Sequence, residues 1–347
     1  MLTLGALERA IKAAVEFIAI NRSSDGLWRD FQTDAGASSD WVTAFVAYAL
    51  GHVGHLNDAI LDTLKLLLFR QRPNGGWSYN KTVPTDCDST AWVLMSFSVA
   101  PAWKPSSVVR GIRYIKNHQD MTLGGFSTYS DQDHIDRFIG VTDSNLTEGW
   151  CYVHPCVTGV ALQSLIAHGE QVHSCCIISA TKYLLLERDT SGLWRSYWWK
   201  GYGYSTYHAM RALYMSRALN TDQASRTRFS LLIKQQKDGG WNDSSGQRSE
   251  VFATAFNVLS LLLLPDPITI QAADRGAAWL LRQQNSDGSW PTSPILRIPP
   301  PMVREPKDIE AWRTNQLGTG VIIEDGARIF TSAAALWSLS IFRSMID

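Results

Sequence analysis

Residues 71–77 read QRPNGGW, and this stretch decides the fold because variants of it recur along the chain. Each variant has a glycine, one further residue and then an aromatic residue. The six aromatic residues are Trp28, Trp77, Phe126, Trp194, Trp241 and Trp290. Their spacing is 47–49 residues, apart from one interval of 68 residues before Trp194. A fixed period of this length indicates stacked structural repeats.

Each glycine–aromatic turn lies between two segments with helical periodicity. The preceding segment is amphipathic, as in residues 57–71, NDAILDTLKLLLFRQ. The following segment is apolar on every face, as in residues 252–264, FATAFNVLSLLLL, which is typical of a buried helix. The pattern predicts six helix pairs, with amphipathic helices outside and buried helices inside. Spacing alone does not decide between a closed ring and an open superhelix.

The overall composition limits the class of function. The 347 residues include 32 basic and 32 acidic side chains, so the chain has no net charge to attract nucleic acid. Five cysteines, two of them adjacent at Cys175 and Cys176, do not form a disulfide framework, which favours a reducing cytoplasm. The first 22 residues read as an amphipathic helix with charges at Glu8, Lys12 and Glu16, and not as a signal peptide. No stretch reaches the roughly 18 uncharged apolar residues that a membrane-spanning helix needs.

Residues 83–92, VPTDCDSTAW, place Asp86 and Asp88 at the predicted start of an inner helix. One interpretation is an ordinary helix cap, since Asp, Ser and Thr favour this position. The other interpretation is a proton donor, because two buried carboxyl groups close together resist double ionisation. Only the second repeat has two acids here. The corresponding pair is Ser39 and Trp41 in the first repeat and His154 and Cys156 in the third.

The stretches QRPNGGW, QQKDGGW and QNSDGSW resemble the repeat motif of the squalene-hopene and oxidosqualene cyclases, which are class II terpene cyclases. DCDSTA, residues 86–91, is similar to that family's Asp-rich protonation motif, with Ser89 in place of its last Asp. The resemblance implies an all-α, α6/α6 toroid of six repeats, forming a single domain over residues 1–347. The second helical barrel of the large triterpene cyclases has no counterpart, and the chain looks like the bacterial enzymes that cyclise a polyprenyl chain attached to an aromatic acid.

The same resemblance implies the residues of the active site. Asp88 would donate the proton and Asp86 would assist it. Further positions match residues that line the family's cavity or stabilise cations, and these are Tyr79, Tyr129, Trp198 and Tyr204. The family's histidine partner of the acid is replaced by Val160, and His154 is the candidate substitute. Two further segments have counterparts in the family, namely the insertion that ends GVTD at residue 143 and the segment Gly318–Gly320. Beside the second segment, Val321 and Ile329 replace the family's aromatic residues.

These residues suit the chemistry of alkene protonation. A buried carboxyl group keeps its proton because desolvation disfavours the charged form. Aromatic faces attract a carbocation by about 1–2 kcal/mol each when desolvated, and they do not quench it as water would. The resemblance therefore predicts an isomerase or intramolecular lyase. Its substrate would be a hydrophobic polyprenyl molecule, most simply a polyprenylated aromatic acid or phenol, and its product a polycyclic meroterpenoid.

Three alternatives share the toroid. A cyclase of prenyl diphosphates, giving drimane or labdane skeletons, would need Mg²⁺ or a basic pocket, for which Arg297, Arg304 and Arg313 are the candidates. A zinc-dependent prenyltransferase subunit would need metal ligands, but Cys151, His154, Cys156 and His208 lack the matching carboxylate. A non-catalytic lipid carrier would explain the aromatic residues but not the paired acids. We therefore expect no metal ion or other cofactor unless the substrate is a diphosphate.

The proline-rich segment 291–306, PTSPILRIPPPMVREP, is predicted to be an irregular loop. It is apolar, and it contains three consecutive prolines that exclude a helix. We interpret it as a cavity lid or an entrance that contacts a membrane surface, with an ordinary surface insertion as the alternative. The protein would then be cytoplasmic, with peripheral membrane contact left open.

Overall fold

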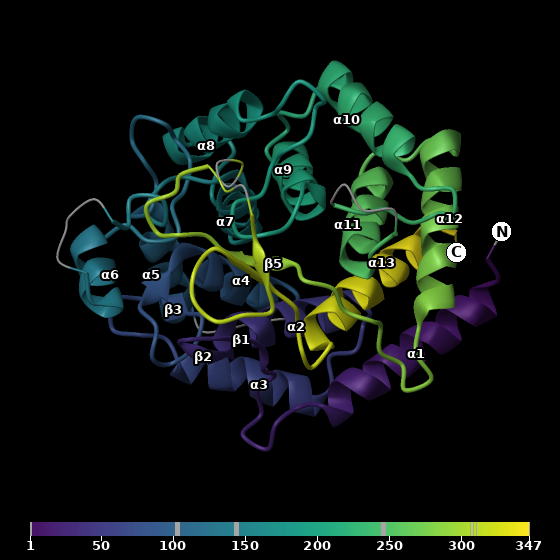
Figure 1. Ribbon diagram of the computed structural model, residues 1–347, viewed down its shortest axis with the longest axis horizontal. Helices are drawn as coiled ribbons and strands as arrows, with labels where there is room; N and C mark the ends of the chain where they lie inside the picture. The colour runs from purple at the N-terminus through teal and green to yellow at the C-terminus, as the bar shows by residue number, and fades with distance from the viewer. Residues whose placement is uncertain are drawn as a thin grey trace.

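A computed structural model describes residues 2–100, 105–141, 146–243, 248–305, 307, 309 and 311–346. The described residues form thirteen α-helices and seven short strands (Figure 1). The predicted six helix pairs are present, and they account for all of these helices except the short α6 (Gln132–Ile139). Residues 142 and 143 of the insertion ending GVTD lie outside the described residues.

The second helices of the pairs form the inner layer. They are α2 (Asp40–His52), α4 (Cys87–Ser98), α7 (Pro155–Ala167), α9 (Gly203–Met215), α11 (Val251–Leu262) and α13 (Ile329–Ile346). Each packs against the next, and α13 packs against α2, so the contacts run in a closed cycle. Their side chains are almost entirely buried, as their apolar sequences predict.

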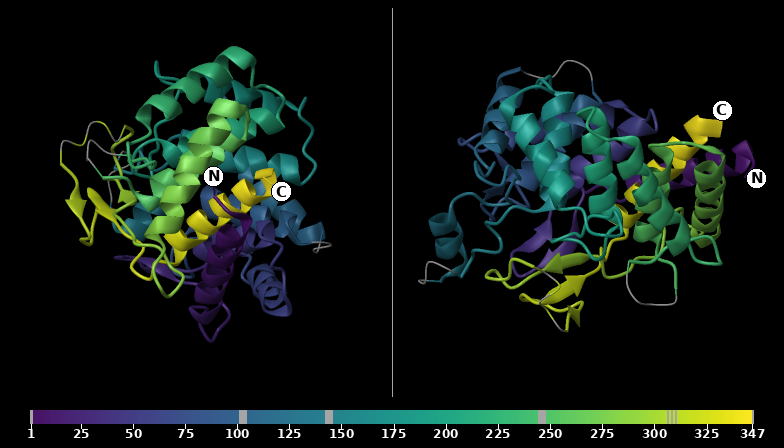
Figure 2. Two further views of the ribbon diagram at one scale, coloured as in Figure 1. Left: turned by 90° about the vertical axis from the view of Figure 1, so that its right-hand side faces the viewer. Right: turned by 90° about the horizontal axis from the view of Figure 1, so that it is seen from above.

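The first helices of the pairs lie outside this layer (Figure 1). They are α1 (Leu4–Ile20), α3 (Asp58–Phe69), α5 (Pro105–Lys116), α8 (Cys175–Leu186), α10 (Thr221–Lys234) and α12 (Pro267–Gln283). The helix α1 packs along α13, so the first and last helices meet (Figures 1 and 2).

The repeat tryptophans connect each outer helix to its inner partner. Trp77 donates its Nε1–H to the Leu67 carbonyl near the end of α3 (2.6 Å), and its backbone N–H to Thr90 Oγ1 of α4 (2.9 Å). Trp241 makes the same two bonds, to Leu231 and Thr254. These tryptophans therefore have a structural role within each helix pair.

The repeat glutamines connect neighbouring outer helices. Gln235 Nε2 donates to the Gly239 carbonyl in its own turn (2.8 Å) and to the Ala272 carbonyl of α12 (2.9 Å). Gln284 bonds in the same way to Gly288 and to Ala10 of α1. The intervening glycine is required at Gly288, where φ is +87° and a Cβ atom would lie 2.2 Å from the Ala13 carbonyl oxygen.

Short strands and loops cover the end of the ring where the inner helices begin. Strands β1 (Asp30–Thr33) and β2 (Gly36–Ser38) form one hairpin, and β3 (Trp77–Ser78) pairs with β4 (Thr85–Asp86). A three-stranded sheet of order β5–β7–β6 comprises Leu296–Ile298, Val321–Ile323 and Arg313–Thr314. It projects from the helices in both views of Figure 2. The prediction that residues 291–306 are entirely irregular is wrong, because residues 296–298 pair with residues 321–323.

One described helix, α13, is long and apolar enough to cross a membrane by length and composition. It includes Arg343, and 72% of its span is buried inside the protein. Its position in the inner cycle explains this composition, because a helix that is buried on all sides is apolar on all sides.

Candidate functional site

The main cavity lies where the inner helices α2 and α4 begin, and it has a volume of about 590 Å³. Ligand pockets of small molecules have volumes in this range. The residues that line it come from widely separated parts of the chain. They include Thr33, Asp34, Trp41, Tyr79, Asp86, Asp88, Thr128, Tyr129, Trp150, Trp198, Trp199, Pro301 and Thr319.

Asp86 is the N-cap of α4. Its Oδ1 accepts a hydrogen bond from the Ser89 backbone N–H (2.6 Å), and the residue is 4% exposed. Burial raises the pKa of Asp86 to about 7, even though the Ser89 hydrogen bond favours the charged form. The interpretation of this residue as a helix cap is therefore confirmed, and the same carboxyl group also faces the cavity.

Asp88 lies in the first turn of α4 and has a different environment. Its Oδ1 is buried and has no hydrogen-bond partner among the described residues, while the side chain lines the cavity. Burial, followed by the charge of Asp86, raises the pKa of Asp88 well above its ordinary value. Both effects favour the protonated form of the Asp88 carboxyl group.

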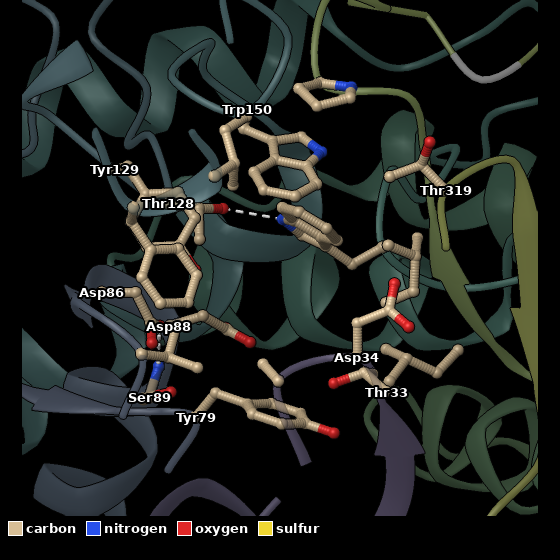
Figure 3. Close-up of a pocket in the computed structure, with 18 of the residues that line it drawn as sticks. Thr33, Asp34, Tyr79, Asp86, Asp88, Ser89, Thr128, Tyr129, Trp150 and Thr319 are labelled. Atoms are coloured by element: carbon tan, nitrogen blue, oxygen red, sulfur yellow. Dashed lines mark hydrogen bonds between the residues drawn. The ribbon is translucent and has the colours of Figure 1, made fainter. Parts of the chain in front are cut away.

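Aromatic side chains form much of the remaining wall. Tyr79 stacks on Trp41 with ring centroids 6.2 Å apart. Trp198 donates its Nε1–H to Thr128 Oγ1 (2.7 Å), a bond drawn in Figure 3, and its ring lies 5.8 Å from that of Trp150. The predicted residues Tyr79, Tyr129 and Trp198 all line the cavity with the two aspartates.

Tyr204 and His154 do not line the cavity, contrary to expectation. Tyr204 is fully buried beneath Trp199, with centroids 4.6 Å apart, and its Oη accepts a hydrogen bond from Trp92 Nε1 (2.9 Å). His154 stacks on Tyr197 at 3.6 Å, and its Nε2 lies 2.9 Å from the Gly149 carbonyl oxygen. Burial lowers the pKa of His154 to about 3, and none of its described hydrogen bonds reaches Asp88.

Sequence reasoning did not assign Trp41 and Trp150 to the cavity. Trp41 could have been found, because it stands in the first repeat where Asp88 stands in the second. Trp199, the immediate neighbour of Trp198, also lines the cavity. The position of Trp150 depends on a long loop, whose backbone at Gly149 and Trp150 bonds to the Pro301 carbonyl. No repeat pattern predicts such a contact.

The three arginines of the final insertion lie outside the cavity wall. Arg297 Nη1 donates to the Ser196 carbonyl (3.1 Å), Arg304 pairs with Glu148, and Arg313 Nη2 donates to the Thr319 carbonyl (2.6 Å). No Lys or Arg is found among the described residues that line the cavity. In the described part of the chain, no three His, Cys, Asp or Glu side chains are placed to hold a metal ion.

Figure 3 shows how the polar groups divide the cavity. Asp86, Asp88 and Ser89 lie on one side, and Thr33, Asp34 and Thr319 lie on the opposite side. A linear molecule could therefore place an alkene beside the carboxyl groups and a polar end among the threonines.

Residues 123–296 match the squalene-hopene cyclase C-terminal domain family. Drimenyl diphosphate synthase from Streptomyces showdoensis is 24% identical over 276 residues, covering 76% of this chain and 48% of that protein. Squalene–hopene cyclase from Zymomonas mobilis is 25% identical over 325 residues, covering 82% of this chain and 48% of that protein. The chain thus spans about half the length of the curated relatives it matches.

Solved structures of similar length give a closer match. A variant of the type II terpene cyclase MstE from Scytonema, in complex with its substrate geranylgeranyl dihydroxybenzoate, superposes with a TM-score of 0.90. It is 29% identical, with 99% of each chain covered. A second variant, in complex with the product merosterolic acid A, has a TM-score of 0.88 and 28% identity, covering 99% of this chain and 98% of that one.

Proposed function

Because the chain belongs to the squalene-hopene cyclase C-terminal domain family, we propose that it is a class II terpene cyclase. Its substrate would be a linear polyprenyl chain attached to an aromatic acid or phenol, and its product a polycyclic meroterpenoid. The observation that carries the proposal is a cavity walled by aromatic rings, with two buried carboxyl groups at one side of it.

The closed cycle of inner helices supports the predicted α6/α6 toroid, formed by one domain. In this architecture the proposed proton donor, Asp88, lies in the first turn of α4. Free N–H groups at a helix N-terminus favour negative charge, so they stabilise the carboxylate that remains after proton transfer. Asp86 binds one of these N–H groups directly, at Ser89.

Asp88 starts the reaction by transferring its carboxyl proton to the terminal alkene of the folded chain. The new C–H bond leaves a tertiary cation, and each following alkene attacks it to form a ring. Tyr79, Tyr129 and Trp198 present aromatic faces to the cation, and the apolar wall excludes water. Loss of a proton, or capture by a hydroxyl group of the substrate, ends the cascade and gives an isomer of the substrate.

The head group would lie among Thr33, Asp34 and Thr319, where hydroxyl and carboxylate oxygens can bind phenolic O–H groups. A diphosphate would instead call for cationic side chains or Mg²⁺. The lack of Lys and Arg among the described lining residues therefore favours the aromatic head group. The proposed reaction requires no cofactor, because the acid is part of the protein.

We also infer a cytoplasmic location with peripheral membrane contact at the cavity entrance. All five cysteines are described and free, as expected in a reducing compartment. Met302 and Leu317 are 48% and 57% exposed, and they adjoin the lining residues Pro301 and Gly318. Such a surface suits a substrate that partitions into lipid.

The test compares wild type with Asp88→Asn. Each protein is incubated with farnesyl, geranylgeranyl and farnesylgeranyl aromatics and with the matching diphosphates, and the products are analysed by mass spectrometry and NMR. Wild type should form isomers of unchanged mass with fewer alkenes, and Asp88→Asn should form none. Asp62→Asn, which removes an exposed carboxylate on the outer helix α3, is the matched control and should retain cyclisation.

Each other outcome has a definite meaning. Cyclisation of the diphosphates alone would establish the alternative head group. If wild type and Asp88→Asn bind every substrate equally and convert none, the protein is a lipid carrier. Equal cyclisation by both proteins would remove Asp88 from the mechanism.

A further inference from the structure

One side chain, Trp199, lies across the entrance of the inner ring. Its backbone is held by strand β5 on the roof of the cavity: it forms a bridge with Leu296, and the adjacent Lys200 N–H donates to the Ile295 carbonyl (2.8 Å). The indole is 1% exposed and lines the cavity. The backbone of Trp199 is therefore fixed by its pairing with residues 295 and 296.

The indole of Trp199 covers three aromatic rings. Its centroid lies 5.2 Å from Phe330 at an interplanar angle of 13°, 5.0 Å from Phe252 at 25°, and 4.6 Å from Tyr204 at 28°. These residues belong to the first turns of α13, α11 and α9. Trp199 thus covers rings from three of the six inner helices, and Phe330 is also in contact with Trp41 (5.1 Å) and Phe31 (5.3 Å).

The cavity ends at this indole. Trp41 of α2 and Asp88 of α4 line it, whereas Tyr204, Phe252 and Phe330 do not, although they occupy similar positions at the starts of their helices. The three covered rings are at most 1% exposed. Aromatic faces of this kind stabilise a carbocation, and Trp199 separates these three rings from the cavity.

We propose that Trp199 determines the length of the polyprenyl chain that the cavity accepts and the number of rings that form. This inference rests on the proposed function. An indole is larger than one isoprene unit, so removing it would extend the cavity over Tyr204, Phe252 and Phe330. The longer cavity would still be walled by aromatic rings, and an additional isoprene unit could fold there within reach of the growing cation.

The experiment compares wild type with Trp199→Ala and Trp199→Phe. The substrates are farnesyl, geranylgeranyl and farnesylgeranyl derivatives of one phenol, and kcat/KM is measured for each. In Trp199→Ala, the ratio of kcat/KM for the longest accepted chain to that for the next shorter chain should rise at least about tenfold, within the range of methylene discrimination in apolar pockets. Trp199→Phe keeps a flat cover over the three rings and should change the ratio less than about threefold.

Trp198→Ala provides the matched control. Trp198 is the neighbouring residue and also lines the cavity, but it is fixed by Thr128 and does not cover the inner ring. It should lower kcat for all chain lengths without shifting their ratio. An equal change for all chain lengths in Trp199→Ala would overturn the proposal, as would an equal shift in Trp198→Ala.

A binding measurement separates this inference from the proposed function. Fully hydrogenated analogues of the three substrates cannot be protonated, so their dissociation constants do not depend on catalysis. If wild type cyclises nothing, the proposed function fails, while the ratio of dissociation constants in Trp199→Ala still tests the length limit. Should Trp199→Ala not fold, as judged by circular dichroism, Trp199→Leu replaces it with an expected shift of at least about threefold, and an unchanged ratio there would also overturn the proposal.

Discussion

Asp86 and Asp88 are two residues apart, but their surroundings give them different properties. Asp86 accepts the Ser89 N–H as a helix cap, whereas Asp88 Oδ1 has no partner among the described residues. A carboxyl group with a hydrogen bond to its charged form gives up its proton more readily than one without. Asp88 is therefore the stronger candidate to be protonated at neutral pH, and Asp86 is positioned to influence it by charge.

The raised pKa of Asp86 makes stability depend on pH. In the unfolded chain the carboxyl loses its proton near pH 3.8, and in the folded protein near pH 7, so between these values the folded state binds more protons. Stability should then fall as pH rises, by up to about 1.4 kcal/mol per pH unit from this group. Asp86→Asn keeps a good cap residue but does not titrate, so it should lack this slope.

Urea denaturation of wild type and Asp86→Asn between pH 4.5 and pH 7.5 measures the difference. The free energy of unfolding of the variant, relative to wild type, should increase steadily with pH. The exposed variant Asp62→Asn is the control, and its curve should run parallel to that of wild type. Parallel curves for Asp86→Asn would contradict a raised pKa.

At the scale of elements, Asp30 acts as a cap for α13. Its Oδ2 accepts the backbone N–H groups of Ile329 (2.9 Å) and Phe330 (3.2 Å), and its Oδ1 accepts that of Ala327 (3.0 Å). The carboxylate comes from β1 and is 5% exposed. The start of the last inner helix is therefore stabilised by the first strand of the chain.

Removal of this cap should destabilise the ring. Asp30→Ala leaves buried N–H groups without an acceptor, and we expect it to lower the free energy of unfolding by about 2–3 kcal/mol. Asp30→Asn retains an oxygen acceptor and should lower the free energy of unfolding by a smaller amount. Chemical denaturation of both variants checks this order, and an Asp30→Ala protein as stable as wild type would refute the capping role.

At the scale of the whole molecule, the cavity opens on the end of the ring that has exposed apolar side chains. Met302→Ser with Leu317→Ser should reduce co-flotation with neutral phosphatidylcholine vesicles several-fold, because burial of apolar surface drives such binding. Added salt should have little effect. Ile268→Ser is the control, since Ile268 is 63% exposed but lies in the first turn of α12, at the opposite end of the ring. Equal flotation of all three proteins would contradict the membrane contact.

The sequence predicts this architecture well because its signals are local. Each glycine–aromatic turn and each apolar segment is defined within one repeat, and the family resemblance implies the cavity residues Tyr79, Tyr129 and Trp198, which lie close to those turns in sequence. Non-local contacts were not predictable in the same way. Strand β5 depends on residues 321–323, and Tyr204 is hidden because Trp199, held by that strand, lies over it.

The bond from Asp30 to Ile329 joins residues that are 299 positions apart, and this separation affects how the protein is made. At a translation rate of roughly 5–20 residues per second, a ribosome needs roughly 15–60 s to pass from one to the other. During this time α1 and α2 lack α13, and the apolar surface that it covers remains exposed to water. Newly made chains therefore need protection from aggregation until the last inner helix has left the ribosome.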